Sequence, residues 1–297
     1  MNQSRFSRSN ELPFLLMTRF ALRPDAEIID WLGTGGGPPV RRYLDDAWLS
    51  RRFHWFEQIC APSVRGQQDQ GFEWLIGLSS EVPTCWVNRL SRVAGGRARI
   101  LLVEPETSFS EVRRELGHGD EFTSARLDSD DAVSSDFIAK VKDRITPGEA
   151  LCLVHGIQLN ESPRGLFHRF SRSNSFSAFW TRGNRDVFEL GRHKDIGATV
   201  PLRHTVTLRP HYLVYVHDSN TSRYSKRGPF VFRPGRALAR FNLPRGFEPS
   251  FADQVRLAWS TTMGLLDSRL PSLARVVSMW RRRLAESLNS SPIRGEG

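Results

Sequence analysis

The chain has 297 residues, of which 39% are hydrophobic and 10% aromatic, and this apolar content excludes a disordered chain. At roughly 150 residues per domain, the length predicts one large domain or two small ones. Lysine and arginine number 42 against 32 acidic residues, so the net charge of +10 favours a polyanionic partner such as nucleic acid, anionic lipid or a phosphorylated ligand. No apolar run approaches the ~18 residues of a membrane-spanning helix, and the run at 12–17 is too short for a signal sequence.

The three cysteines indicate the redox environment. Cys60, Cys85 and Cys152 are widely spaced, and none belongs to a Cys-x-x-Cys pair. An odd number of isolated cysteines is typical of reduced thiols in a cytosolic protein, and it favours neither a disulfide framework nor a zinc site. We therefore expect a cytoplasmic protein.

In chain order, the predicted elements alternate between strands and helices. After a polar tail at 1–11, the apolar run 12–22 predicts a buried strand, and residues 45–60 have helical spacing with Pro62 as the expected stop. Further predicted strands are 72–78, 98–103, 122–127, 150–158, 205–208 and 212–216, and further predicted helices are 84–93 and 134–144. Apolar strands separated by helices predict an α/β fold with a mixed, mostly parallel sheet flanked by helices.

A different pattern begins near residue 250. Residues 251–269 and 273–288 predict two helices separated by Pro271, so we divide the chain into a main domain at 12–249, a helical extension at 250–288 and a tail at 289–297. The second helix has an apolar stripe, and five arginines with no acidic residue lie between 269 and 284. Such a helix either packs on the main domain or binds an anionic membrane at its surface, and the pattern alone leaves both open.

Three carboxylates follow one of the predicted strands. Asp128, Asp130 and Asp131 come directly after the apolar strand at 122–127, just before a predicted helix. Helix capping accounts for one or two acidic residues at such a position, but three within four residues repel one another. A divalent cation removes that repulsion, and Mg²⁺ and Mn²⁺ prefer carboxylate oxygens. The pattern therefore favours a metal or ligand site over capping alone.

Several short motifs, taken in order, resemble a known family. They are Thr18, Arg19 and Phe20; Arg52, Phe53, Phe56 and Glu57; Cys60, Ala61, Pro62, Ser63, Val64 and Gln67; Phe72, Glu73, Trp74 and Leu75; residues 126–132; and residues 216–220. Together these pieces resemble the bacterial putative rhamnosyltransferase family, and Asp128-Ser129-Asp130 is similar to the Asp-x-Asp motif of GT-A glycosyltransferases. The resemblance extends over roughly residues 12 to 225.

This resemblance implies a GT-A-like nucleotide-binding fold and a set of ligand contacts. It implies that Asp128, Asp130 and Asp131, with the late histidine His217, hold Mn²⁺ or Mg²⁺ at the donor diphosphate, and that Asp128 also contacts the donor ribose. A surface role for His217 is equally compatible with its position at a strand end.

Four other positions complete the expected donor site. Arg19 and Arg126 are candidates to bind the diphosphate, with ion pairs to Glu57 or the acidic residues as the alternative. Asn220 is a candidate ligand contact or a turn cap. Where GT-A sheets commonly have an aspartate that contacts the uracil or ribose, this chain has Glu81, which leaves the donor base undefined.

A catalytic base is also expected near the acceptor hydroxyl of an inverting transferase. Asp186, Glu189 and Asp195 follow the central part of the chain and are candidates, with Asp186 and Glu189 preferred.

The resulting hypothesis is a metal-dependent glycosyltransferase that moves a sugar, rhamnose by the family's description, from a nucleotide-activated donor to a glycan or lipid-linked acceptor in polysaccharide biosynthesis. The alternative is a non-enzymatic basic protein that binds nucleic acid or anionic membrane. Nucleic-acid binding is disfavoured because basic residues are not interleaved with aromatic ones on strands and no reader motif occurs. We expect a cytoplasmic enzyme, with peripheral contact at the inner face of the membrane if the C-terminal helix binds lipid.

Overall fold

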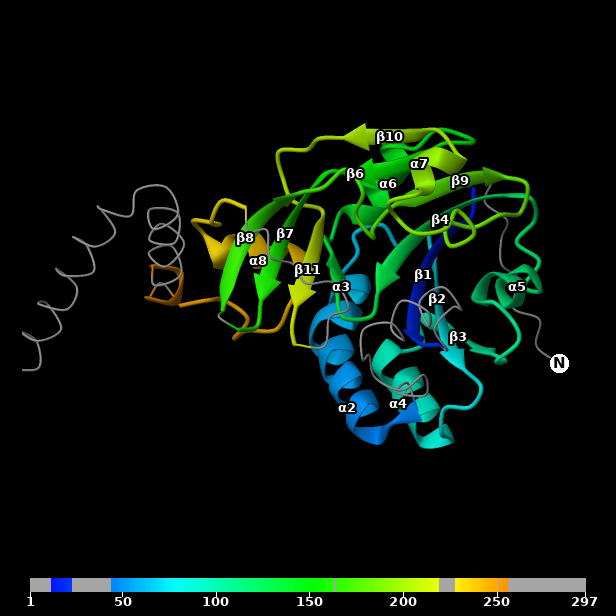
Figure 1. The fold of residues 1–297 in the computed structure, drawn as a ribbon, viewed down its shortest axis with the longest axis horizontal. Coiled ribbons are helices and arrows are strands. Elements are labelled where there is room, and N and C mark those ends of the chain that lie inside the picture. Colours follow the sequence, from blue (N-terminus) through cyan, green and yellow to red (C-terminus); the bar gives the residue numbers. More distant parts are fainter. Residues whose placement is uncertain (1–11, 23–43, 163, 219–227, 251, 256–297) are drawn as a thin grey trace, which may run out of the picture.

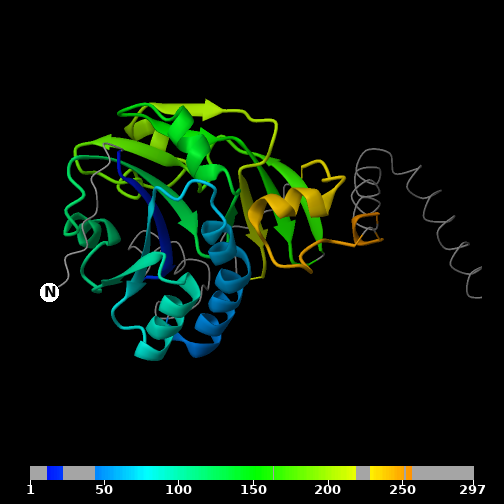
Figure 2. The ribbon, with the colours of Figure 1, turned by 180° about the vertical axis from the view of Figure 1, so that it is seen from behind.

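The computed structural model describes residues 12–22, 44–162, 164–218, 228–250 and 252–255. The predicted tails at 1–11 and 289–297 lie outside these residues, as does most of the predicted helical extension at 250–288. Within the described chain, two β-sheets lie side by side, with helices packed around the larger one (Figures 1 and 2).

The larger sheet has seven strands in the order β10-β6-β9-β4-β1-β2-β3. Its strands are β1 (Phe14–Ala21), β2 (Glu73–Ser79), β3 (Ala98–Val103), β4 (Glu121–Asp128), β6 (Ala150–Leu153), β9 (Ala178–Arg182) and β10 (Leu202–Thr205). Four of the six strand pairings are parallel, and β9 runs antiparallel to both of its neighbours. The predicted α/β architecture with a mixed, mostly parallel sheet is therefore confirmed.

The smaller sheet has four strands in the order β5-β11-β7-β8. They are β5 (Ala132–Val133), β7 (His155–Asn160), β8 (Gly165–Phe170) and β11 (Tyr212–Val216). The chain passes from the larger sheet to the smaller one between β4 and β5, so the acidic segment lies where the two sheets meet (Figure 1).

Helices cover both faces of the larger sheet. The first cluster of buried side chains joins β1 to α2 (Asp46–Trp55), α4 (Thr84–Ala94) and α6 (Phe137–Arg144), and the opposite face packs against α5 (Phe109–Arg114). Alternate residues of β1 contribute to each cluster, because successive side chains of a strand point to opposite faces. This two-sided burial explains why β1 is an uninterrupted apolar run. The described chain also includes α3 (Ala61–Arg65), α7 (Ile196–Thr199) and α8 (Pro234–Leu238).

Several predicted boundaries were wrong. Pro62 does not end the first helix, because a π-helical turn (Phe56–Cys60) precedes it and places the proline in the first turn of α3, where no backbone N–H is required. The apolar run 150–158 is split between β6 and β7, which belong to different sheets. The two-residue strand β5, rather than a helix, follows the acidic residues. The strand expected at 205–208 is instead β10, which ends at Thr205.

Among the described residues, no helix combines the length and apolar character needed to cross a membrane.

Candidate functional site

The acidic segment connects the two sheets. β4 ends at Asp128 in the larger sheet, and β5 begins at Ala132 in the smaller one. Ser129, Asp130 and Asp131 form the connection, and each is at most 6% exposed. The backbone N–H of Asp131 donates to the carbonyl of Asp128 at 3.1 Å, which closes a tight turn. The predicted strand end is confirmed, and two ionisable side chains are buried immediately beyond it.

Asp130 is held by two side chains from distant parts of the sequence. Its Oδ2 accepts a hydrogen bond from Arg52 Nη1 at 3.0 Å and another from His217 Nε2 at 2.9 Å. Burial raises the pKa of the Asp130 carboxyl, but the Arg52 charge and the His217 hydrogen bond outweigh it, so the pKa lies below its usual range. An ionised carboxylate can only accept, which places the His217 proton on Nε2. Asp130 is therefore a buried anion with a cationic partner.

His217 is fixed by an aromatic neighbour as well as by Asp130. Its ring stacks on the indole of Trp55, with ring centroids 3.5 Å apart and planes inclined by 19°. Arg52, the other partner of Asp130, also has an aromatic neighbour. Its guanidinium lies 5.3 Å from the ring centroid of Trp48. Trp48, Arg52 and Trp55 all belong to α2, so this helix supplies one wall of the site and the end of β11 the other.

Asp131 points to the smaller sheet. Its Oδ1 accepts the backbone N–H of Tyr215, on β11, at 2.9 Å. Burial, followed by the charges of Asp130 and Asp128, raises the pKa of Asp131 well above its usual value. The thiol of Cys60 is also fully buried beside these carboxylates, and burial and the same negative charges raise its pKa. Negative charge is therefore concentrated at the junction of the sheets.

Asp128 lies at the other end of the segment, next to two arginines. It is paired in register with Arg19 on β1, and it shares one face of β4 with Arg126, two residues earlier. The guanidinium carbons of Arg19 and Arg126 lie 4.8 and 4.5 Å from the ring centroid of Phe188. Within the described residues, the Asp128 carboxylate has neither a hydrogen bond nor an ion pair. The structure thus brings together three of the predicted donor-site residues.

The two preferred base candidates lie in a separate ion-pair cluster. Asp186 is fully buried, accepts a hydrogen bond from Ser110 Oγ at 2.9 Å and pairs with the buried Arg113 at 3.3 Å. Glu189 pairs with Arg114 and accepts the backbone N–H of Asp186 at 2.9 Å. Through these contacts, both carboxylates stabilise the segment that follows β9. None of the contacts involves Asp130.

Two of the remaining predicted residues lie elsewhere in the described chain, and the third lies outside it. Glu81 is exposed in the turn after β2, where its backbone N–H donates to Ser79 Oγ at 3.3 Å. Asp195 is paired with Arg192 at 2.8 Å on the surface. Asn220 lies outside the described residues.

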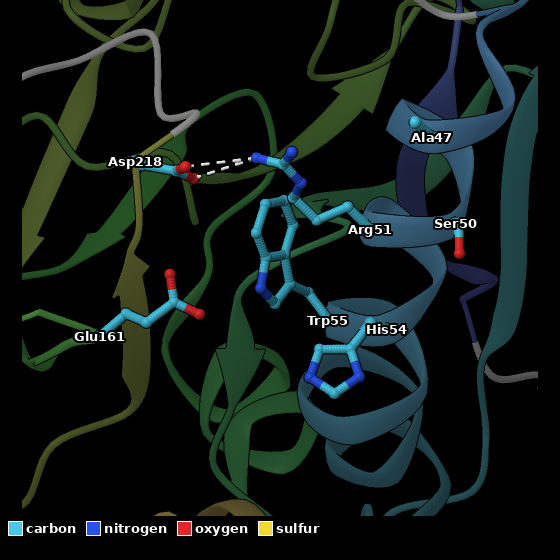
Figure 3. Close-up of a pocket in the computed structure, with 7 residues that line it drawn as sticks. All are labelled: Ala47, Ser50, Arg51, His54, Trp55, Glu161 and Asp218. Atoms are coloured by element: carbon cyan, nitrogen blue, oxygen red, sulfur yellow. Dashed lines mark hydrogen bonds and ion pairs between the residues drawn. The ribbon is translucent and has the colours of Figure 1, made fainter.

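A groove opens beside the Trp55–His217 stack, between α2 and the ends of β7 and β11 (Figure 3). It has a volume of about 630 Å³ and is lined by Ala47, Ser50, Arg51, His54, Trp55, Glu161 and Asp218. Arg51 Nη1 donates to both carboxylate oxygens of Asp218, at 3.4 and 3.2 Å, across the groove. Polar side chains from three elements therefore surround this hollow.

Comparison with protein families identifies the class of protein. The model of the family described as "Putative rhamnosyl transferase" matches residues 39–228, well over half of the 297 residues. The chain belongs to this family. No curated protein matches the chain.

The solved structures that match this chain are distant. The Staphylococcus aureus TarS 1–349 structure in complex with UDP-GlcNAc is 8% identical, with a TM-score of 0.37, over 72% of this chain and 62% of that one. HddC from Yersinia pseudotuberculosis is 10% identical, with a TM-score of 0.33, over 66% of this chain and 91% of that one. The chain thus spans about three fifths of the length of the TarS structure.

Asp130 and His217 are the residues that could hold a divalent cation, with a substrate supplying further ligands. Asp130 Oδ2 and His217 Nε2 are 2.9 Å apart, and two adjacent ligands of an octahedral ion at 2.0–2.1 Å are about 3 Å apart. The buried Ser129 hydroxyl has no hydrogen-bond partner among the described residues. The described chain has no group of three or more His, Cys, Asp or Glu side chains suited to a metal. Mg²⁺ usually needs only one or two protein ligands, because waters and substrate phosphates supply the others.

Sequence reasoning assigned no role to three residues of the candidate site. Arg52 pairs with Asp130. It is one of the motif residues on which the family resemblance rests, and its place in that motif could have marked it as a site residue. Trp55, which stacks on His217, was interpreted only as part of an apolar helix face. Arg51 has no distinguishing pattern, because its partner Asp218 is 167 residues away.

Proposed function

We propose that this chain is a glycosyltransferase with a GT-A fold. It would transfer a sugar, with rhamnose as the first candidate, from a nucleotide-activated donor to a glycan or lipid-linked acceptor with the help of Mn²⁺ or Mg²⁺. The observation that carries the proposal is the contact of Asp130 with His217, 2.9 Å apart, at the junction of the two sheets. A carboxylate and an imidazole at this separation are suited to one divalent ion. The carboxyl edge of an open α/β sheet is also where ligands bind in such folds.

The arginines provide the second support. Arg19 and Arg126 place two guanidinium groups on the ring of Phe188. Arg19 is in register with Asp128, and Arg126 is two residues before it on β4. Guanidinium groups bind phosphate oxygens in bidentate fashion, so this pair is suited to the donor diphosphate. Asp128, with no partner among the described residues, would face the donor ribose or the ion.

The transfer breaks the bond between the anomeric carbon and the diphosphate oxygen and forms a bond from that carbon to an acceptor hydroxyl oxygen. The hydroxyl proton passes to a base, and the bond electrons leave with the nucleoside diphosphate. A bound divalent cation neutralises the charge that develops on the leaving diphosphate. Arg19 and Arg126 would bind the same oxygens, and Arg52 would keep Asp130 ionised and oriented.

Thermal unfolding tests this proposal on the full chain. A ligand that binds the folded state raises the unfolding midpoint. With Mn²⁺ plus UDP, TDP or GDP we expect one nucleotide to raise the midpoint, and Mn²⁺ alone to raise it much less, because the protein offers an incomplete set of ligands. Midpoints unmoved by every combination would contradict the proposal.

We also propose a cytoplasmic location and a peripheral contact between the basic segment at 269–284 and anionic lipid. Both proposals rest on composition alone. Co-sedimentation with anionic and neutral vesicles, comparing the full chain with one that ends at Pro271, tests the contact. Equal recovery of both chains from both vesicle types would contradict it.

A further inference from the structure

We propose that the groove beside Trp55 binds an uncharged sugar ring of the acceptor, so that one end of a glycan is held next to the metal and donor site. This inference rests on the proposed function, because it assigns the second substrate to a separate surface. The groove residues come from α2, from the end of β7 and from the end of β11 (Figure 3). None of them contributes to the Asp130 contacts or to the cluster of Arg19, Arg126 and Phe188.

The groove offers hydrogen-bonding groups of both kinds. Among the described residues, the indole N–H of Trp55, the Ser50 hydroxyl and the His54 ring have no hydrogen-bond partner. One carboxylate oxygen of Glu161 accepts from Tyr215 Oη at 3.1 Å, which orients Glu161 and leaves its second oxygen for a ligand. In Figure 3 the indole nitrogen of Trp55 lies on the side of the ring toward Glu161.

This mixture favours a polyhydroxylated ring over an anion. Sugar hydroxyls both donate and accept, so neighbouring hydroxyls can be shared between an indole N–H and a carboxylate. A phosphate or carboxylate ligand would instead be repelled by Glu161 and Asp218, and the charge of Arg51 is already directed to Asp218. A volume of about 630 Å³ is within the usual range of small-molecule sites.

The position of the groove connects it to the reaction. Trp55 separates the groove from His217, with the two rings 3.5 Å apart, and His217 in turn contacts Asp130. Asp218, on the groove side, is the next residue after His217. A sugar in the groove would therefore lie one aromatic ring away from the proposed ion.

Saturation-transfer NMR on the full chain can test the groove with the methyl glycosides of rhamnose, glucose and N-acetylglucosamine as probes. The blocking variant is Ser50→Trp, an exposed position on α2 that lines the groove, and its matched control is Ser91→Trp, an exposed position on α4. The second variant is Glu161→Gln, with Glu115→Gln as its matched exposed control. Because all four positions are exposed, we expect unchanged unfolding midpoints.

The proposal predicts that at least one glycoside binds the parent chain. Binding should weaken at least about tenfold in Ser50→Trp and severalfold in Glu161→Gln, as expected for a blocked site and for a lost charged acceptor. Both controls should bind like the parent, and all four variants should keep the midpoint shift caused by Mn²⁺ and nucleoside diphosphate.

Three results would overturn the acceptor site. They are no binding of any glycoside to the parent, equal glycoside binding in Ser50→Trp and Ser91→Trp, or loss of nucleotide binding in Ser50→Trp with glycoside binding retained, which would make the groove part of the donor site. In the last case the proposed function stands. The absence of any nucleotide effect on the parent chain would instead contradict the proposed function itself.

Discussion

His217 Nε2 lies 2.9 Å from Asp130 Oδ2, although 87 residues separate the two in sequence. The contact arises because the chain crosses from the larger to the smaller sheet at Asp130 and returns to the same place at the end of β11. Arg52, from α2, completes the group at 3.0 Å from the same oxygen. In the proposed metal site, the ion would replace part of this contact.

Replacement of Asp130 by asparagine tests that role. We expect Asp130→Asn to abolish the midpoint shift produced by Mn²⁺ with nucleoside diphosphate, since the amide is a much weaker ligand for a hard cation. From sequence alone, removal of one of three crowded carboxylates would not be expected to lower stability. The contacts of Arg52 and His217 reverse that expectation, and we predict a loss of about 1–3 kcal/mol.

The measurements for Asp130→Asn are urea unfolding and the thermal shift described above. Asp143→Asn is the matched control, because Asp143 pairs only with Lys140 and Arg144 on the surface of α6 among the described residues. An Asp130→Asn protein that retains the full Mn²⁺-dependent shift would remove Asp130 from the proposed metal site.

Asp131→Asn should have the opposite effect on stability. The raised pKa of Asp131 means that the folded state binds its proton more tightly than the unfolded state does, so its ionisation destabilises the fold as the pH rises above the unfolded value of about 3.9. Asparagine removes the charge and can still accept the Tyr215 N–H through Oδ1. We expect a more stable apo protein at pH 7 and little difference near pH 3, measured by urea unfolding. A variant less stable than the parent at pH 7 would contradict this.

Four strands of the larger sheet were predictable because burial on both faces demands long apolar runs. β3 matches its predicted range, and β1, β2 and β4 differ from theirs by one or two residues. In the smaller sheet, β11 matches its predicted range, but β7 was not distinguished from β6. The run 150–158 is apolar throughout, and no residue marks the point where it changes sheets. β8 and β9 were missed altogether.

The site was predictable only in part, for a similar reason. The three aspartates stand out because like charges rarely cluster without a ligand. The partners that define their geometry come from α2, where Arg52 and Trp55 have ordinary positions on a helix. Asp186 was unpredictable for the same reason. Its buried carboxylate pairs with Arg113 on α5, 73 residues earlier, and no local pattern indicates this contact.

Arg126→Gln should weaken the diphosphate contact specifically. Arg126 shares the ring of Phe188 with Arg19, and the loss of one charged donor to a phosphate oxygen corresponds to about tenfold in affinity. Calorimetric titration with nucleoside diphosphate should show this loss, whereas Arg182→Gln, at an exposed ion pair on β9, should bind like the parent. Equal affinity of the two variants would exclude Arg126 from the donor site.

The three thiols should differ in reactivity. Cys85 is exposed, whereas Cys60 and Cys152 are buried, and burial raises the pKa of both buried thiols. Because the thiolate is the reactive form, we expect iodoacetamide to modify Cys85 alone in the native protein and all three after unfolding. Peptide mass spectrometry identifies the modified residue. Native modification of Cys60 at the rate of Cys85 would be inconsistent with the packing of the π-helical turn.

Asp136 should be a main source of acid sensitivity. Burial raises its pKa, but hydrogen bonds from His211, Ser134 and Arg240 lower it far more, so the folded pKa lies far below the unfolded value of about 3.9. Its carboxylate accepts from Arg240 Nη2 at 2.8 and 2.9 Å and from Ser134 Oγ at 2.6 Å. A depressed pKa contributes stability that is complete well above the unfolded value and is lost as the pH falls below it.

Asp136→Asn should therefore lower the free energy of unfolding by about 2 kcal/mol at pH 7, because hydrogen bonds to a charged group are lost. The difference from the parent should shrink steadily below about pH 4. In this range the Asp136 carboxyl of the unfolded parent is protonated, whereas the variant has no carboxyl at this position. Urea unfolding at pH 7, 4 and 3 measures this, with Asp143→Asn as the exposed control, whose loss should stay below about 0.5 kcal/mol. A loss in Asp136→Asn that is the same at all three pH values would show that the side chain contributes through shape rather than charge.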